Sequence, residues 1–146
     1  MFSKEQLFKI FRNSSDIGVV FRYKGNPPFE SNTHHVFIIL CKMKDNNLLL
    51  VNGTSRYDKK FDILEKMGQE PSKTLVTINP GEYDFFPLKT AIDCNTVHKI
   101  PLDDLNIEDF EYILNGKLKS KDLSKIIQGI KNSHTVPLHI KNILDQ

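Results

Sequence analysis

Two histidines and a hydroxyl-rich loop flank the two most apolar segments of the chain. The pair His34 and His35 comes directly before the first segment, VFIILC, and the loop 52–57 (NGTSRY) comes directly after the second, LLLV. Histidine can exchange a proton near neutral pH, and a guanidinium fork suits a phosphate. Runs this short, bounded by turn formers, predict two adjacent antiparallel strands at the centre of a sheet. We expect the histidines at one mouth of this sheet and the NGTSRY loop at the other.

A carboxylate ends another predicted strand, where Asp93 precedes Asn95, Thr96 and His98. A base, hydroxyl donors and a cation are the groups needed to cleave RNA without a metal. The base removes the proton of the ribose 2′-hydroxyl, that oxygen attacks the neighbouring phosphorus, a cation stabilises the added charge and an acid protonates the leaving 5′-oxygen. Only RNA carries that hydroxyl. The chemistry requires the loop and the carboxylate to share one cleft.

Several side chains are therefore candidates. The candidate catalytic residues are Asp93, Thr54, Ser55, Arg56, His34 and His35. The candidate phosphate contacts behind the loop are Lys59 and Lys60, and Asn95 is a further candidate for binding RNA. Each also has a structural interpretation, because carboxylates and hydroxyls commonly accept hydrogen bonds from turn amides. Spacing alone does not decide between these interpretations.

Signatures of metal and nucleotide sites are absent from the sequence. It contains neither HExxH nor CxxC, and neither GxxxxGK nor GxGxxG. Cys41 and Cys94 lie in apolar or mixed segments without the spacing of a disulfide framework or a redox motif. We therefore expect no metal, no cofactor and a reduced, cytoplasmic setting.

The composition favours one domain over residues 1–146, because 146 residues with 39% hydrophobic content can close a core. The net charge of +2 is too small to indicate a nucleic-acid binder by itself. The N-terminal segment is charged and amphipathic, so neither a signal peptide nor a membrane span is expected.

Hydrophobic periodicity and turn residues predict strands first and helices last. The expected strands are 16–23, 36–41, 48–51, 74–78 and 85–92, the last broken by Pro87. The expected helices are 3–13 with a Ser3 cap, 58–67 stopped by Pro71, a piece within 102–114, 120–132 capped by Ser120, and 138–144 after Pro137. This pattern predicts an α+β fold, with a small curled antiparallel sheet covered by C-terminal helices.

The order of the segments resembles the MazF/PemK-type toxins of bacterial toxin–antitoxin pairs. The likeness covers most of residues 16–132 and is carried by DIGVV, the strand HHVFIIL, LLLVNGTS, KTAIDCNTVHKIPLDDL and the helix GKLKSKDLSKIIQGI. It implies an SH3-like β-barrel, over about 16–100 in this chain, with a C-terminal helix, and a homodimer. To this the sequence adds the N-terminal helix and extends the helical part over about 101–146. The resemblance also implies an endoribonuclease acting on single-stranded RNA and inhibited by an antitoxin protein that occupies the RNA groove.

By position, the resemblance implies site roles for Thr54 and Ser55, for Asp93 and, in the polar flap, for Glu30. The chain departs from the family at the histidine pair, where an Arg-Pro is frequent, and at Ala91, where a basic residue is frequent. The N-terminal helix, an insertion at 58–72 and the tail from His134 also make it longer than a typical member. Three hypotheses remain open: a divergent toxin-like endoribonuclease, a non-catalytic SH3-like module that binds RNA or a protein, and a structural subunit of a larger assembly.

Overall fold

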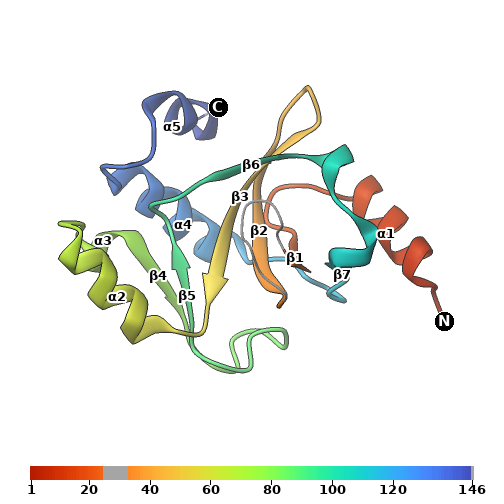
Figure 1. The fold of residues 1–146 in the computed structure, drawn as a ribbon, viewed down its shortest axis with the longest axis horizontal. Coiled ribbons are helices and arrows are strands. Elements are labelled where there is room, and N and C mark those ends of the chain that lie inside the picture. Colours follow the sequence, from red (N-terminus) through yellow and green to blue (C-terminus); the bar gives the residue numbers. More distant parts are fainter. Residues whose placement is uncertain (25–32, 146) are drawn as a thin grey trace.

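The computed structural model describes residues 1–24 and 33–145 and has an α+β fold (Figure 1). A seven-stranded antiparallel sheet is accompanied by helices from both ends of the chain. The strands are β1 (Val20–Tyr23), β2 (His35–Lys42), β3 (Asn47–Thr54), β4 (Leu75–Ile78), β5 (Thr90–Asp93), β6 (His98–Pro101) and β7 (Phe110–Glu111). The α-helices are α1 (Lys4–Asn13), α2 (Tyr57–Lys66), α3 (Pro71–Thr74), α4 (Ser120–Asn132) and α5 (Leu138–Leu144). Two 3-10 turns are η1 (Leu102–Asp104) and η2 (Ile107–Asp109).

The predicted pair of central strands is confirmed as β2 and β3. The strand order is β4-β5-β3-β2-β1-β7, and β6 pairs with β3 beside β5. Asn46 closes the turn between β2 and β3 with a positive φ of 64°, a conformation that asparagine tolerates. Among the described residues no pairing joins β4 to β7, so the sheet is open at these two strands.

Both faces of β2 and β3 are buried, which explains why their sequences read as continuous apolar runs rather than as alternation. Ile38 and Leu40 face one cluster, which contains Ile126 of α4. Phe37 and Ile39 face a second cluster, which contains Phe11 of α1. The sheet therefore lies between α4 on one face and α1 on the other, and its rigid centre leaves the strand ends to carry polar groups.

The predicted N-terminal helix is confirmed together with its cap. The Ser3 hydroxyl accepts from the backbone N–H of Gln6 at 3.1 Å, and the Gln6 side chain accepts from the Ser3 backbone N–H at 2.7 Å. This reciprocal pair is a capping box, which satisfies backbone donors at the helix start. Phe11, only 2% exposed, anchors α1 on the sheet.

The other helix signals were partly wrong. The helix at 58–67 is confirmed as α2, but Pro71 begins α3 instead of only ending the previous helix. A proline suits the first turn of a helix because its missing N–H has no partner there. The helix at 120–132 is confirmed as α4, although its cap residue is Lys119 and Ser120 is already helical. The last helix follows Pro137 as expected.

Two segments differ more from their prediction. The strand expected over 16–23 begins only at Val20, because Gly18 turns the chain with a φ of +88°. The helix expected within 102–114 is wrong. This segment forms η1, η2 and the short strand β7, which pairs with β1, so the part from 101 to 146 is not wholly helical. Likewise, of the strand expected over 85–92 only β5 forms, and residues 85–88 are a loop.

No helix within the described ranges is both long enough and apolar enough to cross a bilayer.

Candidate functional site

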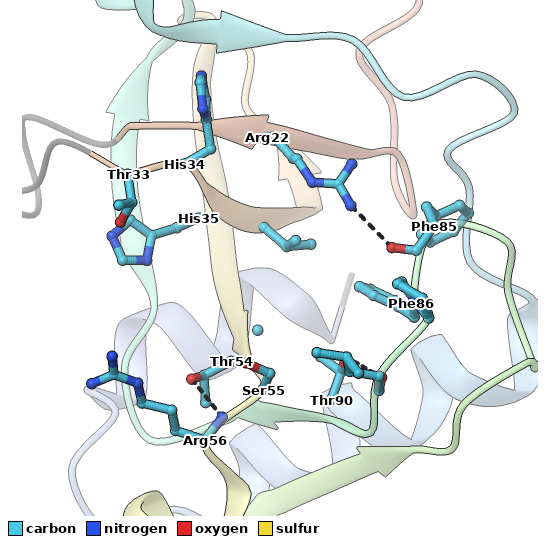
Figure 2. A pocket seen from close by; sticks show the side chains of 14 residues that line it. Arg22, Thr33, His34, His35, Thr54, Ser55, Arg56, Phe85, Phe86 and Thr90 are labelled. Atoms are coloured by element: carbon cyan, nitrogen blue, oxygen red, sulfur yellow. Dashed lines mark hydrogen bonds between the residues drawn. The ribbon is translucent and has the colours of Figure 1, made fainter.

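The antiparallel pairing of β2 with β3 puts the histidines and the hydroxyl loop at the same end of the sheet. Val36 pairs with Gly53, so His35 at the start of β2 lies beside Thr54 at the end of β3. The expectation of two opposite mouths was wrong, because the first residue of one antiparallel strand lies beside the last residue of the other. Figure 2 shows the resulting cluster.

A cleft with a volume of about 580 Å³ opens at this end of the sheet. Among the described residues, its polar lining consists of Arg22, Thr33, His34, His35, Thr54, Ser55, Arg56 and Thr90. Its apolar lining consists of Val36, Gly53, Phe85, Phe86, Pro87 and Leu88. Five of the six candidate catalytic residues thus line one cleft, and it has the size of a small-ligand site. We call it the histidine cleft.

The hydroxyl loop is held in a defined shape by its own hydrogen bond. The Thr54 hydroxyl oxygen accepts from the backbone N–H of Arg56 at 3.1 Å, which turns the chain from β3 into α2 (Figure 2). Gly53 below it is closely covered, because an added Cβ would lie 3.0 Å from both Ile92 Cδ1 and Thr90 Cγ2 and these side chains would have to shift by a few tenths of an ångström. The close approach of β5 therefore fixes the floor of the histidine cleft.

Both histidines line the cleft, but their rings point in different directions. His35 lies on the side of Thr54 and Arg56, and Figure 2 shows the His34 ring directed away from Thr54 and Ser55. Burial lowers the pKa of His35 below 6.5, and the neighbouring charge of His34 lowers it further. His35 is therefore mainly neutral at pH 7, the form that can accept a proton. His34 Nδ1 lies 3.8 Å from Glu111 Oε2 on β7.

Arg22 on β1 is a cleft residue that the sequence analysis missed. Its Nη2 donates to the Phe85 carbonyl at 3.1 Å (Figure 2), and its Nη1 lies 3.9 Å from Glu111 Oε1. Arg22 pairs with Val36 on β2, and Val36 pairs with Gly53 on β3. Arg22 and Gly53 therefore lie on the same face of the sheet. The sequence held a signal for this placement. Arg22 lies between the buried Phe21 and Tyr23, and alternation along a strand turns its side chain to the sheet face opposite to theirs.

A second cavity of about 210 Å³ adjoins the cleft on the side of His35. It shares His35, Thr54 and Arg56 with the histidine cleft and adds Asn52, Lys59, Lys60 and Ile63. The candidate phosphate contacts Lys59 and Lys60 therefore face the same region as Arg56. The N-terminus of α2 begins there as well, and a helix N-terminus favours a negative charge. We call this the α2 cavity.

Asp93 lies on the same sheet face as Thr54 but behind Lys60. Its side chain is 5% exposed, and Oδ2 lies 3.0 Å from Lys60 Nζ. Its Oδ1 accepts from the backbone N–H and the side-chain amide of Asn95 at 2.9 and 3.1 Å. Asp93 lines a third cavity, of about 360 Å³, which Ser55 does not line, and Asp93 does not line the histidine cleft. The expectation that Asp93 and Ser55 share one cleft is therefore not met.

Asn95 is an anchor of the fold. Its side-chain amide donates to Thr74 Oγ1 at 2.9 Å, and its side-chain oxygen accepts from the Ser133 hydroxyl at 2.8 Å. It is 7% exposed, so an RNA strand has little access to it. Its bonds join the turn after β5 to the end of α4, which holds Asp93 in place.

Glu30 lies outside the described residues. Among the residues that are described, no cluster of three or more histidine, cysteine or carboxylate side chains is arranged to hold a metal ion. Cys94 is buried, and burial raises the pKa of its thiol to about 12, so it stays protonated at neutral pH. A thiol in that state is a poor nucleophile.

The histidine cleft thus brings two imidazoles, two arginines and four hydroxyl side chains around one opening, and the adjoining α2 cavity adds two lysines. Such a set can bind a phosphodiester, take up a proton and stabilise added negative charge on phosphorus. No protein-family model matches the chain, and no curated protein matches its sequence.

Proposed function

We propose that the protein is an endoribonuclease that cleaves single-stranded RNA at the histidine cleft by attack of the ribose 2′-hydroxyl. One observation carries the proposal: the pairing of β2 with β3 gathers His35, Thr54 and Arg56 at the same opening, with Arg22 across it. The imidazole can act as the base and the two guanidinium groups can stabilise the phosphate, and neither role needs a metal ion.

The reaction proceeds in one transesterification step. Neutral His35 takes the proton of the 2′-hydroxyl, and the oxygen attacks the adjacent phosphorus. Arg22 and Arg56 hold the phosphate oxygens as negative charge develops on them. The bond to the 5′-oxygen breaks, and that oxygen takes a proton from His34 or from solvent in the open cleft. The products are a 2′,3′-cyclic phosphate and a free 5′-hydroxyl.

His35 is a better base than the other candidates for two reasons. Asp93 is buried, and its oxygens are already bonded to Lys60 and Asn95, so a ribose cannot reach it. The His34 ring points away from the hydroxyl pair (Figure 2). In this mechanism Asp93 is a positioning residue, because its carboxylate fixes the ammonium of Lys60 at the edge of the α2 cavity.

The resemblance to MazF/PemK-type toxins supports the same reaction and supplies the rest of the proposal. In this interpretation the curled sheet is a divergent SH3-like barrel, and the chain acts in the cytoplasm as a homodimer. An antitoxin protein would block the cleft by occupying the place of the RNA. A closed barrel would require β4 to pair with β7, and no such pairing is found among the described residues.

A second candidate function is binding of RNA or of a protein through the same cleft without catalysis. The burial of Asp93 favours it, because the carboxylate implied as catalytic by the resemblance does not face the cleft. The two functions predict different fates for a bound RNA. The nuclease releases shorter products, and the binding module returns the RNA intact.

The test is incubation of the purified protein with single-stranded RNA in excess chelator, followed by gel separation of the products. We expect cleavage by the wild type, a loss of at least about 100-fold in His35→Ala, and a smaller loss in His34→Ala. His139→Ala is the matched control, because His139 is an exposed histidine of α5 that lines neither cavity. Intact RNA with the wild type would favour the binding module, and equal rates for His35→Ala and His139→Ala would contradict the proposed base.

A further inference from the structure

We infer that the RNA site continues from the histidine cleft across the α2 cavity into a nucleobase subsite at Gln69. This inference rests on the proposed function, because it takes single-stranded RNA as the ligand. It adds a second contact region and a residue that determines base preference.

The three cavities are connected through shared walls. The histidine cleft shares His35, Thr54 and Arg56 with the α2 cavity. The α2 cavity in turn shares Lys60 and Ile63 with the third cavity, of about 360 Å³. A strand bound at the histidine cleft can therefore pass over the start of α2 without leaving a lined surface.

Positive charge follows this route. Arg56 and Lys59 are exposed, and Lys60 is half-buried between the α2 cavity and the third cavity. An ammonium has three N–H donors. The contact of Lys60 Nζ with Asp93 Oδ2 at 3.0 Å uses one of them. Lys60 lines both the α2 cavity and the third cavity, so its ammonium lies on the route proposed for the RNA backbone. This charge complementarity favours a nucleic acid over an uncharged ligand.

The third cavity has the composition of a base-binding pocket. Its walls include the apolar side chains Leu64, Val97 and Val136, which suit the flat faces of a base. Gln69 Oε1 is buried in its lining and has no hydrogen-bond donor from the described residues within range. Because an unpaired buried acceptor is costly, a turn of the half-buried Gln69 side chain that brings this oxygen to an N–H of a ligand in the cavity is favoured. The amide of glutamine matches adenine best, since it can donate and accept at the same time.

The subsite comes from the part of the chain that exceeds the resemblance. Gln69 lies in the connection between α2 and α3, within the segment 58–72 that lengthens the chain beyond a typical MazF/PemK-type toxin. Its backbone N–H donates to the Leu64 carbonyl at 2.9 Å, which holds the connection against the end of α2. The insertion thus supplies both the phosphate contact and the base contact.

The test measures binding by fluorescence anisotropy with 2′-O-methyl oligonucleotides, which cannot be cleaved because they have no free 2′-hydroxyl. We expect the hexamer of adenosine to bind at least about tenfold more tightly than the dimer and more tightly than the hexamer of uridine. Gln69→Leu should remove the preference for adenosine. Lys60→Gln, whose amide can still donate to Asp93, should weaken hexamer binding about fivefold. It should also reduce the slope of log affinity against log salt by about 0.7.

Lys66→Gln is the matched control, because Lys66 is exposed on α2 and lines none of the three cavities. Equal binding of dimer and hexamer, or a preference for adenosine that survives Gln69→Leu, would overturn the inference. Circular dichroism of each variant shows that the fold is kept. The outcome is separate from that of the proposed nuclease, because the non-cleavable probes report binding even if no RNA is ever cut.

Discussion

A buried tyrosine–aspartate contact holds the aromatic wall of the histidine cleft, and its removal gives the sharpest prediction for stability. Tyr83 is 8% exposed and donates its hydroxyl to Asp122 Oδ2 on α4. The same hydroxyl oxygen accepts from the backbone N–H of Lys119 at 2.9 Å. Tyr83 thereby ties the loop that carries Phe85, the hydrogen-bond acceptor of Arg22, to the start of α4.

Tyr83→Phe removes both hydrogen bonds and changes little else in volume. Asp122 is 3% exposed, so its carboxylate would lose a partner inside the protein. A hydrogen bond to a charged group contributes about 1.5 to 3 kcal/mol. The position of Asp122 in the first turn of α4 offsets part of the loss through the helix dipole. We therefore expect the free energy of unfolding to fall by about 2 kcal/mol, which lowers Tm by about 6–8 °C in a chain of this size.

The assay is urea unfolding followed by circular dichroism, with Tyr112→Phe as the control. Tyr112 is half-buried, and no hydrogen bond of its hydroxyl to a described residue is found. A double-mutant cycle with Asp122→Ala should give a coupling energy of at least about 1 kcal/mol. A decrease for Tyr83→Phe no larger than for Tyr112→Phe, or a coupling energy near zero, would refute the reasoning.

The same contact predicts a pH effect. Burial and the Asp122 hydrogen bond raise the pKa of Tyr83 from 10.0 to about 12. Because the folded pKa lies above the unfolded value, this stabilisation is complete below pH 10 and is lost as the pH rises toward about 12. Stability measured from pH 9 upward should therefore fall less steeply in Tyr83→Phe than in the wild type.

Three further predictions concern close packing and the proposed base. Gly116→Ala should destabilise the fold by about 3 kcal/mol in urea unfolding, because the new Cβ would lie 2.5 Å from the Val20 carbonyl oxygen; a loss below about 1 kcal/mol would contradict this. Gly129→Ala would bring a Cβ to 2.8 Å from Cys94 Sγ, so Cys94→Ala should cost less stability in the Gly129→Ala background than in the wild type; equal costs would contradict this. The acid limb of kcat/KM for RNA cleavage should have its midpoint below pH 6.5, the side to which burial moves the pKa of His35; a midpoint above 6.5 would exclude His35 as the base.

The local signals in the sequence predicted most of the fold. The Ser3 cap and the hydrophobic periodicity of residues 3–13 identified α1, and the two uninterrupted apolar runs identified β2 and β3. These signals work because they depend on neighbours a few residues away. The prediction for region 102–114 failed because Leu102, Leu105 and Phe110 are buried against the sheet by two 3-10 turns and a short strand. Periodicity does not distinguish these from one amphipathic helix.

The candidate site was predicted in its residue types and not in its arrangement. Thr54, Arg56 and His35 line the cleft, but the sequence analysis placed the histidines at the far mouth because it did not follow the antiparallel pairing through to the strand ends. The burial of Asp93 depends on Lys60 of α2, a tertiary contact without a local signal. Arg22 is a different case. Its alternation with buried aromatic residues was present in the sequence, but the prediction did not use it.

The most direct test of the central claim is the mass spectrum of the products from an oligonucleotide that contains one ribose among 2′-O-methyl residues, cut in excess chelator. Attack by the 2′-hydroxyl predicts a single cut on the 3′ side of that ribose. The upstream product should end in a 2′,3′-cyclic phosphate, and the downstream product should begin with a 5′-hydroxyl. An uncut oligonucleotide, a 5′-phosphate or cuts at the 2′-O-methyl positions would contradict the proposed reaction.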